Sequence, residues 1–461
     1  MTAARRLARF VAALTLDTIP EPVVGRAALL ALDTLGNGLA AAGEDFGRAA
    51  LDVAEGLGGA PESALLGRRA RVAAANAVLA NATLAHGLDF DDTREDAIVH
   101  TGCVAVTTAL AAGEAAGASG RAMLEALIAG VEVMCRVGLA VPGALHARHF
   151  HPTAIAGGFG AVAVAGKLSR LSEAQLAHAF GLVGSQAAGI IEYLADGSWP
   201  KRLHPGWVSH AGVVATLLAR GGFTGPATVL EGEHGLYAAF AGGHDARRLE
   251  ALLDTLGQTW ELEALTLKPY PCGSIAQPYM DCAARLRERD GIKADAVTAI
   301  RCRTSAGPVP RLWEPLAAKH APPNGYAAKF SLPYLLGTIF VRGRAGLAEF
   351  TDAAVRDAEV LRVASRVTYE IDPTIDYPRQ FVGDVEVTLA DGRRLRERQD
   401  RPRGGPDAPL TRAEIENKFR GNAGLALPAA RADAIIRAVS GLAAAPSLKD
   451  LVAALTPENN R

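Results

Sequence analysis

Three cationic or cationisable side chains, Lys201, Arg202 and His204, lie within four residues of one another in the stretch DGSWPKRLHPG. Lysine and arginine donate strong hydrogen bonds to carboxylate and phosphate groups, so this stretch predicts an anion site. A basic turn exposed to water is the alternative interpretation.

The residues around these cations favour the anion site. Pro205 is expected at the first position of the next helix, where free backbone N–H groups would also point at the anion. Trp199 and Trp207 flank the charges in a chain with four tryptophans, and indole rings around cations suggest a partly dehydrated pocket. Lys201 is therefore a candidate catalytic residue, with Arg202 and His204 as candidate substrate-binding residues.

A second group of reactive side chains lies in the stretch HGLDFDDTREDAIVH, which begins with His86 and ends with His100. If a helix continues through this stretch, His86, Asp89 and Thr93 share one face, with Asp92 beside Asp89. Such a cluster could hold a water molecule, a substrate hydroxyl and a proton donor together. A helix end with solvated acids is the plainer alternative, and DxxD-like spacing leaves a magnesium site open.

A third group, RHFHPTAIAGGFGA, places His149 and His151 close to His146 and just before a glycine-rich helix. Pro152 suits the first turn of that helix, so His151 is predicted to lie at the helix N-terminus as the one functional histidine. The spacing differs from the i, i+4 pair of a helical zinc site. A dinucleotide fingerprint is weak here, because no predicted strand precedes the glycines.

The fourth group, LKPYPCGSIAQPYMDCA, contributes a further cation, Lys268, and a thiol, Cys272. Nucleophilic catalysis by Cys272 would need a neighbouring base and a lowered thiol pKa. The preferred interpretation is that Cys272 lines a substrate pocket and that Lys268 binds the substrate.

The composition restricts the classes of protein to consider. The chain of 461 residues has a formal net charge of −1, which disfavours nucleic acid and anionic membranes as partners. Neither a signal peptide nor a transmembrane segment is predicted. The five cysteines lack CxxC spacing, which argues against disulfides, zinc and iron–sulfur clusters and favours a reducing cytoplasm.

The secondary structure that must position these groups is predicted to change near Lys268, from helices to a mixture of strands and helices. Apolar residues at helical spacing predict about ten closely packed helices up to about residue 265. Beyond it, AVTAIRCRT, RVTYEID and DVEVTLADGRRLRER predict strands, the last as a hairpin with an Asp391–Gly392 turn. Helical spacing returns from Thr411. The fold class is therefore mostly α with an inserted α+β domain: a helical domain from residues 1–267 and 404–461, an α+β domain from residues 268–403, and a ligand in the cleft between them.

These four stretches, in this order and over essentially the whole chain, resemble the MmgE/PrpD family. The resemblance rests on AHGLDFDDT, HPTAIAGGFGA, GSWPKRLHPGWVSHAGVVATLLARGGFTGP, KPYPCGSIAQPYMD and KFSLPYLLG. It implies a helical domain with an α+β lid, and a homodimeric enzyme that needs no cofactor and acts on a small polycarboxylate. The residues that it implies for the active site are Asp89, Thr93, His100, His151, Lys201 and Lys268, with Arg202 and His204 adjacent.

The shared chemistry of such enzymes is proton movement at a carbon next to a carboxylate, which requires cations where negative charge develops. His100 and His151 suit the roles of acid and base near neutral pH, in either order. We expect a hydro-lyase, a dehydratase of a 2-methylcitrate-like acid, with no cofactor and no metal. The alternatives are an epimerase of the iminodisuccinate type, a cis-aconitate-type decarboxylase and a non-catalytic carboxylate-binding protein. The decarboxylase is disfavoured, because a histidine of the decarboxylases is replaced near Cys272.

Overall fold

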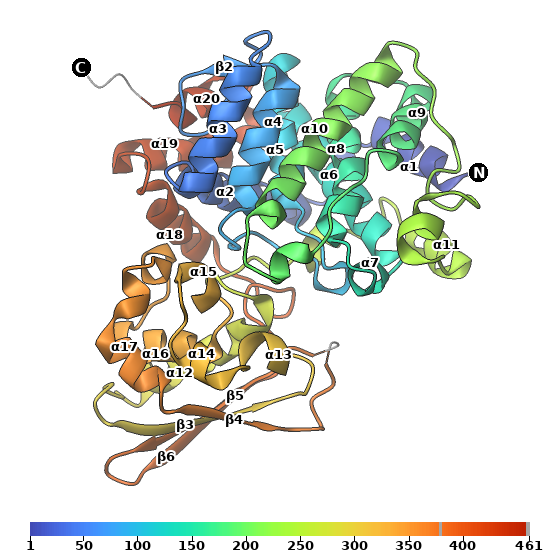
Figure 1. Cartoon of the computed structure of the whole chain (residues 1–461). Helices are drawn as coiled ribbons and strands as arrows, with labels where there is room; N and C mark the ends of the chain where they lie inside the picture. Colours follow the sequence, from blue (N-terminus) through green and yellow to red (C-terminus); the bar gives the residue numbers. More distant parts are fainter. Residues whose placement is uncertain (378–379, 458–461) are drawn as a thin grey trace. The chain divides into compact units, whose positions relative to one another are not determined.

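The computed structural model describes residues 1–377 and 380–457 and divides into two compact units. The helical unit comprises Met1–Leu265 and Thr411–Arg461, and the α+β unit comprises Thr266–Leu410. The α+β unit is thus inserted into the helical unit, and the predicted fold class is confirmed (Figure 1). The units divide at residues 265/266 and 410/411, whereas the sequence analysis placed the domain bounds at 267/268 and 403/404.

The first segment of the helical unit carries eleven α-helices and one short strand pair in its described residues. The helices are α1 Ala3–Ala13, α2 Glu21–Ala41, α3 Asp45–Leu57, α4 Ala74–His86, α5 Gly102–Ala115, α6 Gly120–Leu139, α7 Ala144–Ala147, α8 Pro152–Leu168, α9 Glu173–Gly184, α10 Pro200–Arg220 and α11 Ala246–Asp254. The strands are β1 Ser63–Ala64 and β2 Arg71–Val72, which pair antiparallel.

Helices α5 and α8 form the centre of this unit. Nearly all their residues are buried, as expected for helices that are apolar on every face. Helix α8 packs against α5, α6, α9 and α10. Glycines allow the close approach that the composition predicted: a Cβ at Gly130 of α6 would collide with Val164, and one at Gly212 of α10 with Ala161.

The end of the chain packs back on the helical unit, as predicted. Its helices are α18 Arg412–Ala423, α19 Ala429–Ser440 and α20 Lys449–Leu455. Helix α18 lies against α2, where Asn422 donates a hydrogen bond of 2.9 Å to Asn37. The Lys418 ammonium lies 2.7 Å from the buried Asp33 carboxylate and also donates to the backbone carbonyl of Phe90, at 2.7 Å. The last helices therefore hold the segment that follows α4.

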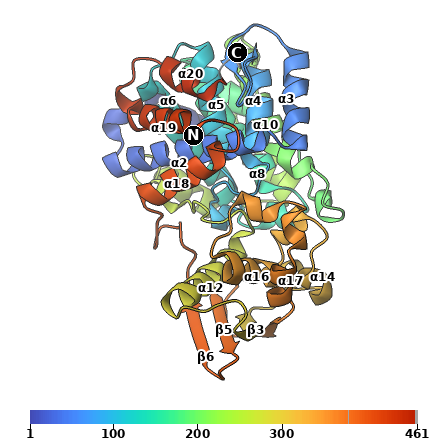
Figure 2. The same cartoon turned by 90° about the vertical axis from the view of Figure 1, so that its left-hand side faces the viewer.

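The α+β unit is a four-stranded sheet with helices on one face (Figures 1 and 2). Its elements are α12 Gln277–Arg289, β3 Val297–Thr304, α13 Val309–Leu312, α14 Leu316–His320, α15 Gly325–Ala328, α16 Leu332–Arg342, α17 Ala358–Ala364, β4 Val367–Ile371, β5 Gly383–Leu389 and β6 Arg394–Gln399. The strand order is β4-β3-β5-β6, with β3 and β4 parallel and the other pairs antiparallel.

The three strand predictions in this unit are confirmed. Val385, Val387 and Leu389 face the buried core of the unit. The β5–β6 hairpin turns at Asp391–Gly392, where Gly392 has a φ of 86° that favours glycine. The five cysteines of the chain are buried free thiols, as their spacing predicted.

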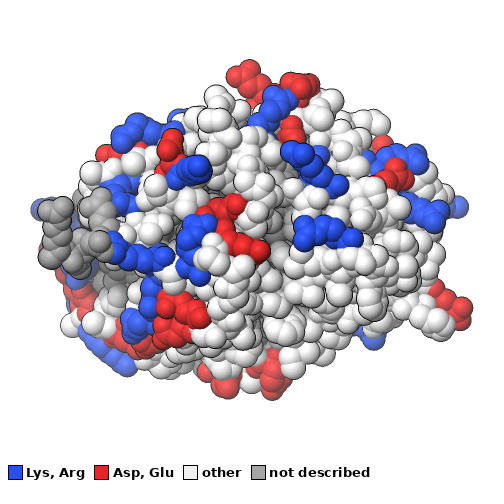
Figure 3. Space-filling view, turned by 90° about the horizontal axis from the view of Figure 1, so that it is seen from above, with Lys and Arg blue, Asp and Glu red and all other residues white. Residues whose placement is uncertain are grey.

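Charged side chains of both signs are scattered over the face seen in Figure 3. On the face shown in Figure 3, lysine and arginine side chains lie among aspartate and glutamate side chains. None of the helices in the described part of the chain combines the length and apolar character needed to cross a bilayer.

The contact of α10 with α4 depends on Gly206. A Cβ at this position would collide with the Leu79 carbonyl oxygen and the Thr83 hydroxyl of α4. We expect Gly206→Ala to lower the free energy of unfolding by about 3 kcal/mol, because a rigid backbone atom must move to admit the methyl group. Urea unfolding measures the change.

The matched control is Gly221→Ala at the C-cap of the same helix. Its φ is −77°, and a Cβ there would lie 3.4 Å from the nearest backbone oxygen. Equal urea midpoints for the two variants would contradict the proposed packing constraint.

Candidate active site

The segment between α4 and α5 folds back on itself and collects the acidic and imidazole side chains. Helix α4 ends at His86, and Asp89 and Ile98 have φ angles of 56° and 54°. This left-handed conformation is tolerated by aspartate but strained for a β-branched residue. The helix does not continue through Thr93, so the helical alignment of His86, Asp89 and Thr93 does not apply and these residues meet through the path of the loop.

Asp92 holds the start of α5. Its fully buried carboxylate accepts hydrogen bonds from the Thr101 backbone N–H at 2.9 Å, the Thr101 hydroxyl at 2.7 Å and the Gly102 N–H at 2.8 Å. Burial, together with the neighbouring charge of Asp91, raises the pKa of Asp92 to about 6. These contacts make Asp92 a structural cap, and its predicted contact with substrate stays a prediction.

His100 is held from three directions. Its Nδ1 lies 2.7 Å from the Asp92 backbone oxygen and 3.2 Å from the Thr93 hydroxyl. Its backbone N–H donates to the Thr153 hydroxyl of α8 at 3.1 Å. A ring nitrogen this close to a carbonyl oxygen carries the proton, so the neutral ring is fixed as the Nδ1–H tautomer.

His86 forms a dyad with Asp91, a residue that the sequence analysis did not select. The Nδ1 of His86 lies 2.7 Å from Oδ2 of Asp91, and both side chains are fully buried. The same Asp91 oxygen lies 3.8 Å from Nδ1 of His100. One carboxylate therefore lies close to two imidazoles.

His151 lies at the N-terminus of α8, as predicted, with Pro152 in the first turn. Its Nδ1 is 3.1 Å from Nδ1 of His204 on α10, and both rings are buried. Burial, with the charges of His86 and Lys201, lowers the pKa of His204 to about 4 and that of His151 well below its usual value. Both rings are thus neutral at pH 7, and one Nδ1 donates to the other.

Lys201 forms an ion pair with Asp89, in which both side chains are largely buried. Helix α10 begins at Pro200, so Lys201 lies in its first turn. The prediction that Pro205 starts the helix is wrong: Pro205 lies inside α10. The cation and the free N–H groups of the helix start are therefore close together, as an anion site requires.

Arg202 has a different environment. Its guanidinium lies over the ring of Phe46 in α3, at 4.3 Å from the ring centroid, and 5.7 Å from that of Trp199. Trp199 and Trp207 are each 48% exposed in the single chain, and the suggestion that they surround a partly dehydrated pocket stays a prediction. The Arg202 guanidinium is thus held against an aromatic ring. Its predicted contact with substrate stays a prediction.

Two candidate residues, Lys268 and Cys272, belong to the α+β unit. Both are buried, and the Cys272 sulfur lies 3.4 Å from the Met280 sulfur and 3.3 Å from the Gln277 amide nitrogen. Their roles with substrate stay predictions.

The helical unit thus brings together most of the sequence-predicted site residues and adds others. The cluster comprises His86, Asp89, Asp92, Thr93, His100, His151, Lys201 and His204. His149 is exposed and His146 is half-buried, and neither belongs to this cluster. Sequence reasoning missed Asp91, Thr153 and Tyr193, whose ring lies 6.4 Å from that of His151. The DFDD run marked Asp91, but nothing in the sequence marked Tyr193.

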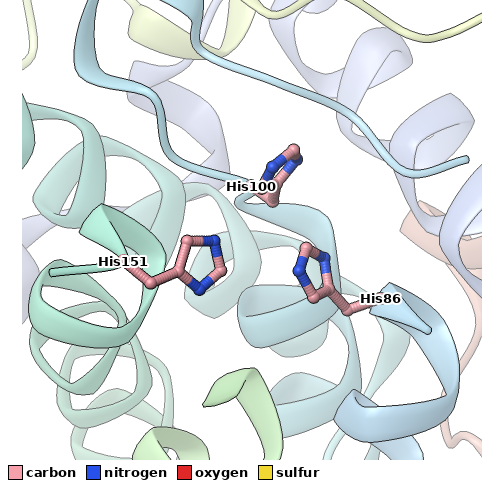
Figure 4. A group of neighbouring side chains, drawn as sticks. All are labelled: His86, His100 and His151. Atoms are coloured by element: carbon pink, nitrogen blue, oxygen red, sulfur yellow. The ribbon is translucent and has the colours of Figure 1, made fainter. Parts of the chain in front are cut away.

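The cluster also has the composition of a metal site. His86, His100 and His151 offer ring nitrogens that lie within 4.8 Å of one another, and the rings point toward one another (Figure 4). His86, Asp91 and Cys103 form a second such group. The sequence analysis expected no metal, because it compared His151 with His146 and His149 and not with His86 and His100.

A buried group of imidazoles, carboxylates and one ammonium can move protons and stabilise negative charge. Such a site, in a helical fold with an inserted α+β unit, is consistent with the family to which comparison with protein-family models assigns the chain. The MmgE/PrpD N-terminal domain family matches residues 5–249, and the MmgE/PrpD C-terminal domain family matches residues 270–443. The chain belongs to the MmgE/PrpD family.

The alignments with several named relatives cover nearly the whole chain. A cis-aconitate decarboxylase-like protein from Aspergillus oryzae is 24% identical over 473 residues, covering 98% of this chain and 97% of its own length. The cis-aconitate decarboxylase of Homo sapiens is 26% identical and covers 92% and 88%. That of Aspergillus terreus is 23% identical and covers 93% and 91%.

The lowered pKa of His204 predicts how stability depends on pH. The unfolded chain binds a proton on this ring below about pH 6.5, but the folded protein only below about pH 4. The free energy of unfolding is therefore unaffected by this ring above pH 6.5 and falls by about 3 kcal/mol as the pH falls from 6.5 to 4, because only the unfolded chain then binds the proton. We expect His204→Asn to lose less stability than the wild type over this range, measured by urea unfolding in EDTA.

Acid-sensitive groups outside the contact of His151 with His204 are common to both proteins, so the difference between their pH profiles reports the burial of this histidine pair. Parallel profiles would contradict the burial of a neutral ring at this position.

Proposed function

We propose that this chain is a lyase that acts on a small di- or tricarboxylic acid, such as a 2-methylcitrate-like acid. It removes a proton from the carbon next to a carboxylate and releases water. The observation that carries the proposal is the buried cluster in which two independently held imidazoles, His100 and His151, have ring centroids 6.2 Å apart, with the charge of Lys201 acting on His151. The buried free thiols also support the expected cytoplasmic location.

His151 is the proposed base. Burial and nearby positive charge keep its ring neutral, so a nitrogen lone pair is ready to accept a proton at pH 7. Neutral His204 shares a hydrogen bond with Nδ1 and holds the ring in place. A bound polycarboxylate adds negative charge next to the ring and raises its affinity for a proton, so substrate binding itself completes the base.

His100 is the proposed acid. The Asp92 carbonyl fixes its Nδ1–H, and the Asp91 carboxylate at 3.8 Å stabilises positive charge on the ring. Charged His100 can then give its Nε2 proton to the leaving hydroxide, which departs as water. The proton taken by His151 and the proton given by His100 balance, and exchange with water restores both rings.

Lys201 is the proposed electrostatic stabiliser. Negative charge grows on the substrate carboxylate as the C–H bond breaks, and an ammonium aimed at it contributes roughly 3 kcal/mol. The ion pair with Asp89 positions the Lys201 chain before substrate arrives. The contribution of Lys268 stays a prediction.

The second candidate is a decarboxylase, and it is favoured by the names of the relatives, several of which are cis-aconitate decarboxylases. In that reaction a carboxylate leaves as carbon dioxide and the resulting carbanion takes a proton from one of the same imidazoles. Both reactions place negative charge beside Lys201, so the site geometry alone serves both.

Proton NMR of the purified chain with di- and tricarboxylates in D2O tests the reaction. We expect a 2-methylcitrate-like acid to lose water and give an unsaturated product, seen as a vinylic proton or, where the α carbon carries the methyl group, as a methyl singlet on the new double bond. Loss of carbon dioxide from cis-aconitate would favour the second candidate, and α-deuteration with inversion but no loss of water would favour an epimerase. Saturable binding without any chemical change would contradict the proposal.

Lys201→Ala tests the electrostatic role on whichever acid reacts. Loss of about 3 kcal/mol corresponds to a fall of about 100-fold in kcat/KM. The matched control is Lys449→Ala, which removes an exposed lysine from the first turn of α20 and should leave kcat/KM unchanged. If Lys201→Ala keeps more than about a tenth of the wild-type kcat/KM, less than about 1.4 kcal/mol was lost and the role is wrong.

We also propose a homodimer, with α10 in the interface. The outer face of this helix carries exposed apolar side chains at spacings of a single helical stripe: Leu203, Trp207, Leu217 and Leu218. Exposed apolar stripes of this kind are typical of association surfaces. The other face of α10 packs on α4 and α8, so a second copy would buttress the helix that carries Lys201.

Light scattering measures the mass of the protein in solution. We expect two chains for the wild type and one for Trp207→Glu, because a charge in the centre of an apolar interface is costly to desolvate. Leu425→Glu, which changes a leucine elsewhere in the helical unit that is 62% exposed against 48% for Trp207, should stay dimeric. A wild-type mass of one chain would contradict the dimer.

A further inference from the structure

Three imidazoles from separate elements converge in the helical unit. His86 is the last residue of α4, His100 lies just before α5, and His151 precedes the first turn of α8. Their ring centroids are 4.8 to 6.2 Å apart, and Figure 4 shows the rings pointing toward one another. One ring nitrogen from each lies within 4.8 Å of the others.

Each of these rings uses its Nδ1 in a contact behind the cluster. Nδ1 of His86 contacts Asp91, that of His100 the Asp92 carbonyl, and that of His151 the ring of His204. Histidines that bind metals have this arrangement: one nitrogen is held by a carboxylate, carbonyl or similar partner, and the other faces the ion. The Nε2 atoms are therefore the nitrogens that can serve as ligands.

The Nε2 of His86 supplies an independent observation. It is fully buried and has no hydrogen-bond partner among the described residues. Buried polar atoms are nearly always paired, so an unpaired ring nitrogen between two other imidazoles points to a ligand. A cation fits there, because the buried Asp91 carboxylate lies behind the rings of His86 and His100 and the Lys201 ammonium is already paired with Asp89.

We propose that His86, His100 and His151 bind a divalent transition metal ion through Nε2. Imidazole is a ligand of Zn²⁺ and Co²⁺, whereas Mg²⁺ and Ca²⁺ require oxygen. Bonds of about 2.0–2.1 Å in a tetrahedral site place the nitrogens about 3.4 Å apart, so the rings close in by about 1 Å on binding. Three nitrogens leave a fourth position for water or a substrate carboxylate.

Metal binding has a consequence that rests on the proposed function. If His151 and His100 are the base and the acid, the metal occupies the lone pairs that carry the protons. Zn²⁺ then inhibits turnover, and a chelator restores it.

Titration of the full-length protein with Co²⁺, after treatment with EDTA and removal of the chelator, tests the site. We expect one equivalent to give the visible d–d absorption of four-coordinate Co²⁺, and Zn²⁺ but not Mg²⁺ to displace it. His86→Ala removes one ligand and should weaken Co²⁺ binding at least 100-fold. Asp91→Asn removes the carboxylate behind that ligand and should weaken it about 10- to 100-fold. His234→Ala, which changes an exposed histidine, should have no effect.

Two further controls keep the result interpretable. Circular dichroism reports whether His86→Ala is folded, and His86→Gln keeps a side chain of similar length in the cavity if it is not. The proposal is overturned by the lack of saturable Co²⁺ absorption, or by equal affinity in the wild type and the folded His86 variant. Zn²⁺ binding without inhibition would leave the metal site standing and contradict the acid–base assignment instead.

Discussion

The Asp92 side chain and backbone together organise the site. The carboxylate accepts three hydrogen bonds from the start of α5, and the carbonyl of the same residue fixes Nδ1 of His100. The free N–H groups of a helix start must be paired wherever the helix is buried, and α5 is buried along nearly its whole length. The requirement to cap a buried helix therefore also sets the orientation of a proposed acid. The tail of the chain supports the same loop, because Lys418 of α18 holds the Phe90 carbonyl.

The balance of charge in the cluster follows from its burial. Asp89 is paired with Lys201 and Asp91 with His86, so two of the acidic groups face a specific partner. His151 and His204 face one another, and burial keeps both neutral. The result is a site with imidazole nitrogens available for protons and with a positive charge held by a salt bridge rather than by water. A bound carboxylate would therefore change the charge balance of the cluster directly.

The same features serve proton transfer and metal binding, which explains why the two proposals meet at one cluster. A neutral imidazole with one nitrogen held from behind is both a good base and a good ligand. Which use dominates depends on what occupies the space among the three rings, an anion with an acidic C–H bond or a cation. The Asp91 carboxylate contacts Nδ1 of His86 and lies 3.8 Å from Nδ1 of His100, so it holds both rings from behind in either case.

The sequence by itself determined the helical unit, the inserted α+β unit, the hairpin at Asp391–Gly392 and most members of the cluster. Periodicity, turn residues and the types of reactive side chains are local properties, and local properties can be read along a chain. Only the tertiary structure decided how the cluster is built. Helix α4 ends at His86, and the loop that follows turns through left-handed backbone conformations at Asp89 and Ile98 that the sequence did not indicate. The packing of whole helices brings together three pairs of side chains: His86 with Asp91, His151 with His204, and Arg202 with Phe46. Such packing depends on every residue in the contact at once, so it could not be predicted from local patterns.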